Sequence, residues 1–410
     1  MRTLVHNIKE IVGTYSSDIR IVKGKDMKNL PTFKNAWMLI ENENILDIGS
    51  GEEPQHIDKR IDAQQGIVFP TWVDSHTHIV FAGNREGEFV DRINGLSYAE
   101  IANRGGGILN SAEKLRRASE QELIDEALGR IHNVIKTGTG ALEIKSGYGL
   151  TVDAEMKMLR VANKLKSLQP LPIKTTLLGA HALPVEYKDN KAGYLKLVCE
   201  TMIPQVVDEG LAEYIDIFCE DGYFDVDDTN RVLDAGVKHG LKPKTHVNQF
   251  KSIGGVRASV DHNAISVDHL EELEDEDVDA LLGSSTIPVA LPLCSLFLSI
   301  PYTPARRLIQ AGLPVAIASD YNPGSSPSGN MSLAVSLACV KMKLNPEEAI
   351  NAATINGAAC LEWSHLYGAL SPGRKASFFI ANNIPSYSFL PYSFGTNHID
   401  SVFIHGKKVV

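Results

Sequence analysis

From residue 66 onward the chain alternates short apolar runs with longer segments of helical periodicity, and no other feature limits its possible folds as strongly. Alternating strand and helix signals indicate a parallel sheet. Eight strand-like runs at this spacing predict an α/β fold, a (β/α)8 barrel of the TIM type, which takes about 250 residues. The eight runs are residues 67–73, 140–144, 173–178, 214–219, 243–247, 264–267, 286–291 and 315–318. The helical patterns include residues 120–136, 152–166 and 346–359.

The two ends of the chain follow a different pattern of short strands and turns. Residues 37–40 and 45–48 are predicted strands, and strand and turn signals return after Gly368. We therefore expect a small β-domain built from both chain ends beside the barrel. The expected limits are residues 1–65 and 366–410 for this β-domain and 66–365 for the barrel.

Composition restricts the class of partner and the compartment. Forty basic and fifty acidic residues give a net charge of −10, which argues against a nucleic-acid partner. A small anionic substrate stays possible, because a local pocket can oppose the overall charge. No run approaches 18 apolar residues, and residues 1–10 lack the apolar core of a signal peptide, so we expect no membrane span and a cytoplasmic protein. The five scattered cysteines form no CxxC motif and predict free thiols in a reducing compartment.

Histidines and a carboxylate follow several of the predicted strands. In a TIM barrel the residues just past the carboxyl ends of the strands meet at one mouth. Because residues i and i+2 of a strand face the same side, His76 and His78 can bind one metal ion together. A lone histidine is more often a hydrogen-bonded core residue, but this pair combined with an aspartate after the eighth strand predicts a metal site. The residues that could complete it are Asp320 and one of His181, His246 or His269.

Two cationic residues near the predicted mouth each leave two interpretations open. Lys145 could be a salt-bridge partner or a modified lysine that bridges two metal ions. It lies one strand early for bridging and precedes a Gly-Tyr-Gly turn, so we expect a single metal ion. Arg85 could be a surface arginine or a bidentate clamp for a carboxylate.

Other residues of the mouth loops give weaker signals. The triple glycine 105–107 fits a flexible loop, an anion-binding nest or a mobile lid. Tyr98 and Tyr148 are core or rim aromatics unless their hydroxyls face the pocket.

Longer motifs add a resemblance to a known family. The histidines after strands one, three, five and six and the aspartate after strand eight resemble the amidohydrolase superfamily. Residues 69–85 (FPTWVDSHTHIVFAGNR), 143–150 (EIKSGYGL) and 319–325 (SDYNPGS) resemble the imidazolonepropionase family. Residues 89–92, 98–101 and 105–108 fit the same family, and the resemblance extends over nearly the whole chain.

This resemblance implies a hydrolase that opens the ring of 4-imidazolone-5-propanoate to give N-formimidoyl-L-glutamate, the third step of histidine degradation. It implies a homodimer and one Zn²⁺ or Fe³⁺ ion held by His76, His78, His246 and Asp320. His269 matches a catalytic histidine, Arg85 would hold the propionate, and His181 would donate to the substrate carbonyl. The implied substrate contacts are Arg85, Tyr98, Tyr148, His181, Gln249, Asn322, Gly324 and Ser325.

One position departs from part of the family. Some members carry Glu where this chain has Gln249, and that Glu is a candidate proton acceptor. A glutamine cannot accept a proton at neutral pH, so the base is expected to be His269 or Asp320. The nature of the ligands does not separate zinc from iron, since imidazole and carboxylate bind both.

Two rival functions stay open at this point. A related amidohydrolase that deaminates a purine or pyrimidine would share the metal ligands but needs no carboxylate clamp such as Arg85. A non-catalytic barrel scaffold would be expected to lose metal ligands, whereas every matched ligand is present here.

Overall fold

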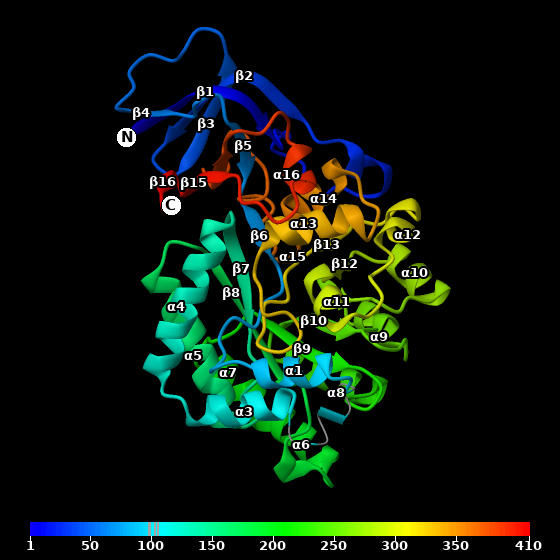
Figure 1. Cartoon of the computed structure of the whole chain (residues 1–410). Helices are drawn as coiled ribbons and strands as arrows, with labels where there is room; N and C mark the ends of the chain where they lie inside the picture. Colours follow the sequence, from blue (N-terminus) through cyan, green and yellow to red (C-terminus); the bar gives the residue numbers. More distant parts are fainter. Residues whose placement is uncertain (97–99, 102–103, 105) are drawn as a thin grey trace.

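The eight predicted strands form one parallel, nearly closed barrel. The computed structural model describes residues 1–96, 100, 101, 104 and 106–410 (Figure 1). Each barrel strand overlaps one of the eight predicted runs, so the predicted barrel is confirmed. In sheet order the strands are β6 (Trp72–Asp74), β7 (Thr139–Lys145), β8 (Ile173–Ala180), β9 (Tyr214–Cys219), β10 (Lys242–Val247), β11 (Ser266–His269), β12 (Ile287–Ala290) and β13 (Ala316–Ile317).

The seam between β6 and β13 is held by contacts just beyond both strands. The amide of Asp320 donates to the carbonyl of His76 at 3.0 Å, and the amide of His78 donates to that of Tyr321 at 2.9 Å. The carboxylate of Asp74 also accepts the backbone N–H and the hydroxyl of Ser319. The candidate functional residues that follow the first and last barrel strands therefore lie side by side.

Helices pack around the outside of the barrel (Figure 1). Residues 120–136 form the predicted helix, which begins with a capping box at Ser119, and the helix predicted over 152–166 continues to Leu168. The helices are α1 (Glu86–Ile93), α3 (Ile108–Arg117), α4 (Glu120–Lys136), α5 (Val152–Leu168), α6 (Lys191–Leu197), α7 (Ile203–Asp208), α8 (Val226–Lys238), α9 (Gly255–Asp261), α10 (Asp275–Leu282), α11 (Pro292–Leu298), α12 (Ala305–Gln310), α13 (Met331–Val340), α14 (Pro346–Ala353), α15 (Ile355–Cys360) and α16 (Phe389–Tyr392). Short 3-10 or π turns are η1 (Gly24–Lys28), η2 (Val185–Tyr187) and η3 (Val198–Met202).

The helix predicted over residues 346–359 is in fact two helices, α14 and α15. Thr354 between them leaves the helical region, with φ −121° and ψ −92°. The break lets α15 lie directly on β6, where a side chain at Gly357 would come within 2.5 Å of the Val73 carbonyl oxygen. The need for a glycine at residue 357 therefore arises from packing against β6, a strand far away in the sequence.

Both chain ends build a second, mainly antiparallel sheet, as predicted. Figure 1 shows the N-terminal and C-terminal strands together at one end of the barrel. In it β14 from the tail pairs with β5. The strands are β16 (Lys407–Lys408), β15 (Ile399–Ile404), β14 (Phe378–Ala381), β5 (Ile67–Pro70), β1 (Arg2–Val12), β2 (Thr32–Glu41) and β3 (Asn44–Ser50) in sheet order, with β4 (Lys59–Asp62) paired to β1.

The first predicted run, residues 67–73, serves both sheets. Its first half is β5 of the small sheet and its second half begins β6 of the barrel. Phe69 stacks on Phe379 at 5.0 Å between ring centroids, and Trp72 packs against the same ring at 5.1 Å. This buried aromatic contact joins the small sheet to the barrel.

Two expectations about the chain as a whole are also tested. The five cysteines are all unpaired. Within the described residues, no helix is long and apolar enough to cross a bilayer.

Candidate metal centre and substrate pocket

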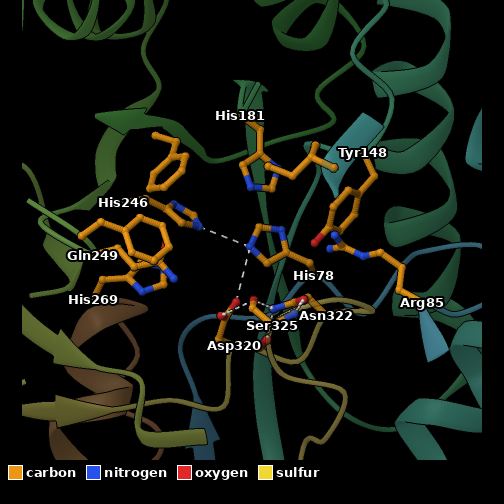
Figure 2. A pocket seen from close by; sticks show the side chains of 13 residues that line it. His78, Arg85, Tyr148, His181, His246, Gln249, His269, Asp320, Asn322 and Ser325 are labelled. Atoms are coloured by element: carbon orange, nitrogen blue, oxygen red, sulfur yellow. Dashed lines mark hydrogen bonds and ion pairs between the residues drawn. The ribbon is translucent and has the colours of Figure 1, made fainter. Parts of the chain in front are cut away.

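A pocket lies at the carboxyl ends of the barrel strands (Figure 2). Most of the site residues predicted from sequence line it. They are His78, Arg85, Tyr148, His181, His246, Gln249, His269, Asp320, Asn322 and Ser325. His76 lies buried beside them, Gly324 packs against the Arg85 guanidinium, and Tyr98 falls outside the described residues.

Three histidines present an unprotonated nitrogen to one point because their other nitrogen is engaged. Nδ1 of His76 lies 2.6 Å from Asp268, and Nδ1 of His246 lies 2.9 Å from Asp216. Nδ1 of His78 donates to a backbone carbonyl at 3.2 Å. Burial lowers the pKa of all three rings well below the usual histidine value, so each is neutral with its proton on Nδ1.

The three Nε2 atoms fit a metal ion and fit poorly without one. Nε2 of His78 and Nε2 of His246 are 3.3 Å apart, and neither carries a proton to share. Buried Nε2 of His76 has no hydrogen-bond partner. Two nitrogens bound about 2.0 Å from a tetrahedral ion lie roughly 3.3 Å apart. A cation between these lone pairs would remove their repulsion and satisfy the unpartnered nitrogen.

Asp320 supplies the carboxylate of this group. Its Oδ1 is 3.5 Å from Nε2 of His76 and 3.8 Å from Nε2 of His78, and Figure 2 shows His78 between His246 and Asp320. Burial raises the pKa of Asp320 to about 6, which a bound cation would counteract. Asp320 adopts a positive φ of 53°, a region where Asp is enriched and which often marks functional sites.

His269 lies beside His246, with 5.3 Å between the ring centroids, and has a carboxylate next to its ring. Its Nδ1 is 3.4 Å from Oε2 of Glu271, which leaves Nε2 to accept a proton. Burial lowers the pKa of His269, but the charge and hydrogen bond of Glu271, together with the charges of Asp320 and Asp268, outweigh burial and the net pKa is raised. A neutral imidazole with a raised pKa is suited to general base chemistry.

His181 is held in a different state. Its Nδ1 donates to the carbonyl of Gly147 at 2.9 Å, and burial lowers its pKa to about 4. The neutral ring therefore has an acceptor, not a donor, at Nε2. This geometry does not support the expected hydrogen bond from His181 to a substrate carbonyl.

Arg85 is buried at the pocket wall and is not the surface arginine of the alternative interpretation. Its Nη1 lies 3.5 Å from Glu88, a long contact, while Glu88 also accepts from Asn110 at 2.8 Å. Gly324 permits this position, since a Cβ there would lie 1.8 Å from an Arg85 nitrogen. A glycine is therefore needed opposite the guanidinium.

Asn322 organises the loop that carries Asp320 and Ser325. Its side-chain oxygen accepts the N–H groups of Gly324 and Ser325, both at 2.8 Å. Its side-chain nitrogen donates to the carbonyl of Asp320 and to the hydroxyl of Ser325. The amide is thus fully used inside the loop.

The loop with Tyr148 is shaped by a buried carboxylate that the sequence analysis did not identify. Glu155, at the start of α5, accepts the N–H groups of Gly147, Gly149 and Leu150 at 2.7–2.9 Å. Gly147 has φ 112°, where any other residue would be strained. This loop holds Tyr148 against the pocket.

Gln249 lies on the pocket wall, with its amide nitrogen 3.4 Å from the sulfur of Cys294. Cys294, Phe218 and Phe250 were also not identified from the sequence. Phe218 is the next-to-last residue of a predicted strand, so its place near the mouth follows from a rule close to the one used for the histidines. Nothing local in the sequence marks Cys294 or Phe250.

Comparison with known proteins extends over the full chain. The model of the amidohydrolase family matches residues 226–409. The chain is 60% identical to a protein of Christiangramia forsetii and 55% identical to one of Flavobacterium johnsoniae, both named imidazolonepropionase, with 100% of each chain covered. A solved triazine hydrolase from Arthobacter aurescens has a TM-score of 0.76 at 14% identity, covering 100% of this chain and 94% of that one, and supports the fold alone.

Proposed function

Because the chain belongs to the imidazolonepropionase family of the amidohydrolases, we propose that it opens the ring of 4-imidazolone-5-propanoate with water. The chain is a metal-dependent hydrolase of histidine degradation, and the product is N-formimidoyl-L-glutamate. The observation that carries this proposal is the pocket itself. Histidine nitrogens that could hold a metal ion converge at one wall, and the Arg85 guanidinium lies at another.

The metal ligands in this proposal are His76, His78, His246 and Asp320. Their support is the convergence of donor atoms and the unpartnered Nε2 of His76. The family implies a divalent metal ion, and we propose one zinc or iron ion in this position. Such an ion would lower the pKa of the attacking water by several units.

Residues other than the metal ligands orient the substrate. Arg85 binds the propionate carboxylate through its planar fork, which holds the imidazolone ring toward the opposite wall. Tyr148, Gln249 and Ser325 contact the ring or its polar groups, and Gly324 provides room for Arg85. Asn322 acts through the loop that it holds together. Tyr98 remains a proposed contact.

His269 accepts the proton of the attacking water and returns it to the leaving nitrogen, because its Nε2 is unprotonated and Glu271 stabilises the protonated ring. We propose this role for His269 in preference to Asp320, which is committed to the metal site. His181 is proposed to accept an N–H of the substrate instead of donating to its carbonyl.

The rival functions are less well supported. A nucleobase deaminase would not need a buried arginine in the pocket wall, and the full-length relatives carry a different name. A scaffold without chemistry would not need a converging ligand set.

The direct test is turnover of purified protein on 4-imidazolone-5-propanoate, with metal analysis of the same preparation. We expect formation of N-formimidoyl-L-glutamate with about one metal ion per chain. Ammonia release from guanine or cytosine in place of this reaction would establish the deaminase, and absence of both metal and turnover would establish the scaffold.

Arg85→Ala should lower kcat/KM for this substrate by about 10–100-fold with unchanged metal content. A hydrogen bond to a charged group contributes about 1.5–3 kcal/mol, and each 1.4 kcal/mol is a factor of ten. Arg85→Lys should lower kcat/KM by a smaller factor, because lysine keeps the positive charge but lacks the planar guanidinium that binds a carboxylate through two hydrogen bonds. Steady-state kinetics and elemental analysis provide the measurement.

The matched control is Arg160→Ala, which removes an exposed arginine paired with Glu209 on the outside of the barrel. It should leave kcat/KM unchanged. Normal kinetics in Arg85→Ala would exclude the clamp.

The remaining proposals concern the larger assembly. We propose domain limits of 1–65 and 366–410 for the β-domain and 66–365 for the barrel, with β5 at the start of the barrel range contributing its strand to the sheet of the β-domain. We also propose a homodimer in solution, which light scattering after size exclusion measures.

A further inference from the structure

Five charged side chains fill the barrel interior beneath the metal ligands, and none has any solvent exposure. They come from four strands and comprise two cations and three carboxylates, so the group carries a formal charge of −1. Buried charges are costly unless they are paired and hydrogen-bonded. The five residues, called the interior charge cluster below, are Glu143, Lys145, Asp216, Lys244 and Asp268.

Lys145 lies at the centre of the interior charge cluster. Its Nζ is 2.8 Å from Asp216, 2.9 Å from Glu143 and 3.5 Å from Asp268. These three carboxylates match the three protons of an ammonium group. A metal-bridging modification of Lys145 would put a fourth anion among three carboxylates, so the salt-bridge interpretation is the one confirmed.

Two of these carboxylates also hold metal-ligand histidines, through the same oxygen that contacts the lysine. Oδ2 of Asp268 is the atom 2.6 Å from Nδ1 of His76. Oδ2 of Asp216 is the atom 2.9 Å from Nδ1 of His246. A single ammonium therefore connects the partners of two rings that approach the ion from different strands.

We propose that Lys145 is a positioning residue of the metal centre: its ammonium ties Asp216 and Asp268 together and so orients the rings of His76 and His246. This inference rests on the ligand set proposed above. Without the ammonium, two buried carboxylates would lose their common cation and repel each other. The rings they hold would then lose a fixed orientation, and metal affinity would fall.

Lys244 offers a matched comparison inside the same cluster. Its Nζ contacts Glu143 at 2.7 Å and the carbonyls of Ser75 and Cys360 at 3.2 and 3.3 Å. Lys244 forms its ion pair with Glu143, whereas the two aspartates that hold histidines pair with Lys145. Removal of Lys244 therefore removes the same buried charge without separating those aspartates from their cation.

The experiment compares zinc affinity of metal-free Lys145→Met, Lys244→Met and Lys145→Met/Glu143→Gln protein by competition with a chromophoric chelator. The double variant restores the cluster charge to −1 but leaves both aspartates without Lys145. We expect zinc binding weakened by about 10–100-fold in both variants that lack Lys145, the usual range for a lost partner of a ligand. Lys244→Met should bind zinc nearly as the unmodified protein does.

Two further measurements separate positioning from stability. The melting temperature should fall in both single variants and recover in the double variant, whereas zinc affinity should not recover. The visible absorption of bound Co²⁺ should change with the loss of Lys145 and stay unchanged in Lys244→Met, because it reports ligand geometry. If Lys145→Met does not fold, zinc affinity and the Co²⁺ spectrum are measured on the charge-balanced double variant instead.

Zinc affinity that recovers together with melting temperature in the double variant would overturn the proposal in favour of simple charge balance. Equal loss of affinity in Lys244→Met, or unchanged affinity and Co²⁺ spectrum without Lys145, would do the same. A wrong ligand set is detected separately, because His76→Ala would then keep its metal.

Discussion

His76→Ala is expected to lose bound metal and to lower kcat/KM by about 10³-fold or more. The Lewis-acid contribution of a metal ion is worth several kcal/mol, and each 1.4 kcal/mol changes a rate tenfold. His76 is the most informative ligand to remove, because its buried Nε2 has no hydrogen-bond partner and its donor atom belongs to two of the possible ligand groups. Elemental analysis of the purified variant and steady-state kinetics measure the two effects.

A histidine outside the pocket provides the control for this experiment. His262 also pairs with an aspartate, Asp234 at 3.1 Å, but lies at the end of α9 away from the pocket residues. His262→Ala should keep full metal content and activity. Stoichiometric metal retained in folded His76→Ala would remove His76 from the ligand set.

The sequence was sufficient for those parts of the fold that depend on local periodicity. All eight barrel strands and the helices α4 and α5 lie where apolar spacing predicted them. The break at Thr354 and the division of residues 67–73 between two sheets were not predictable in this way. Both depend on close packing between segments far apart in the sequence.

For the site, the sequence identified residues that share a simple positional rule. Histidines directly after barrel strands were expected at the mouth, and His78, His181, His246 and His269 line the pocket. The rule did not identify Asp216, which lies within a predicted apolar run. A charged residue inside a strand that is otherwise apolar is the signal that could have identified it, as it could have for Glu143 and Lys244.

The roles of individual atoms required the structure. His181 was expected to donate a hydrogen bond, but the carbonyl of Gly147 determines which nitrogen carries the proton. The partner of His269, Glu271, is only two residues away, yet the sequence does not show that the strand end turns back to bring them together. Positive φ values at His269 and Leu270 produce that turn.

His269→Asn should lower kcat/KM by about 10²–10⁴-fold while the metal stays bound, which is the usual contribution of a general base. Asparagine cannot accept a proton at neutral pH, but it tolerates the positive φ of 89° at this position better than most residues. The comparison with Asp320→Asn separates the two candidate bases. Asp320→Asn should lose metal along with activity, whereas His269→Asn should lose activity alone.

The pH dependence of kcat/KM tests whether His269 is the proton acceptor. A proton acceptor works in its neutral form, and the net pKa of His269 is raised, so kcat/KM should increase with pH through a midpoint above the usual histidine value of about 6.5. Glu271 raises that pKa by stabilising the protonated ring, so Glu271→Gln should shift the midpoint to lower pH. An unchanged midpoint in Glu271→Gln, or the same acidic limb in the residual activity of His269→Asn, would assign the titrating base to another group.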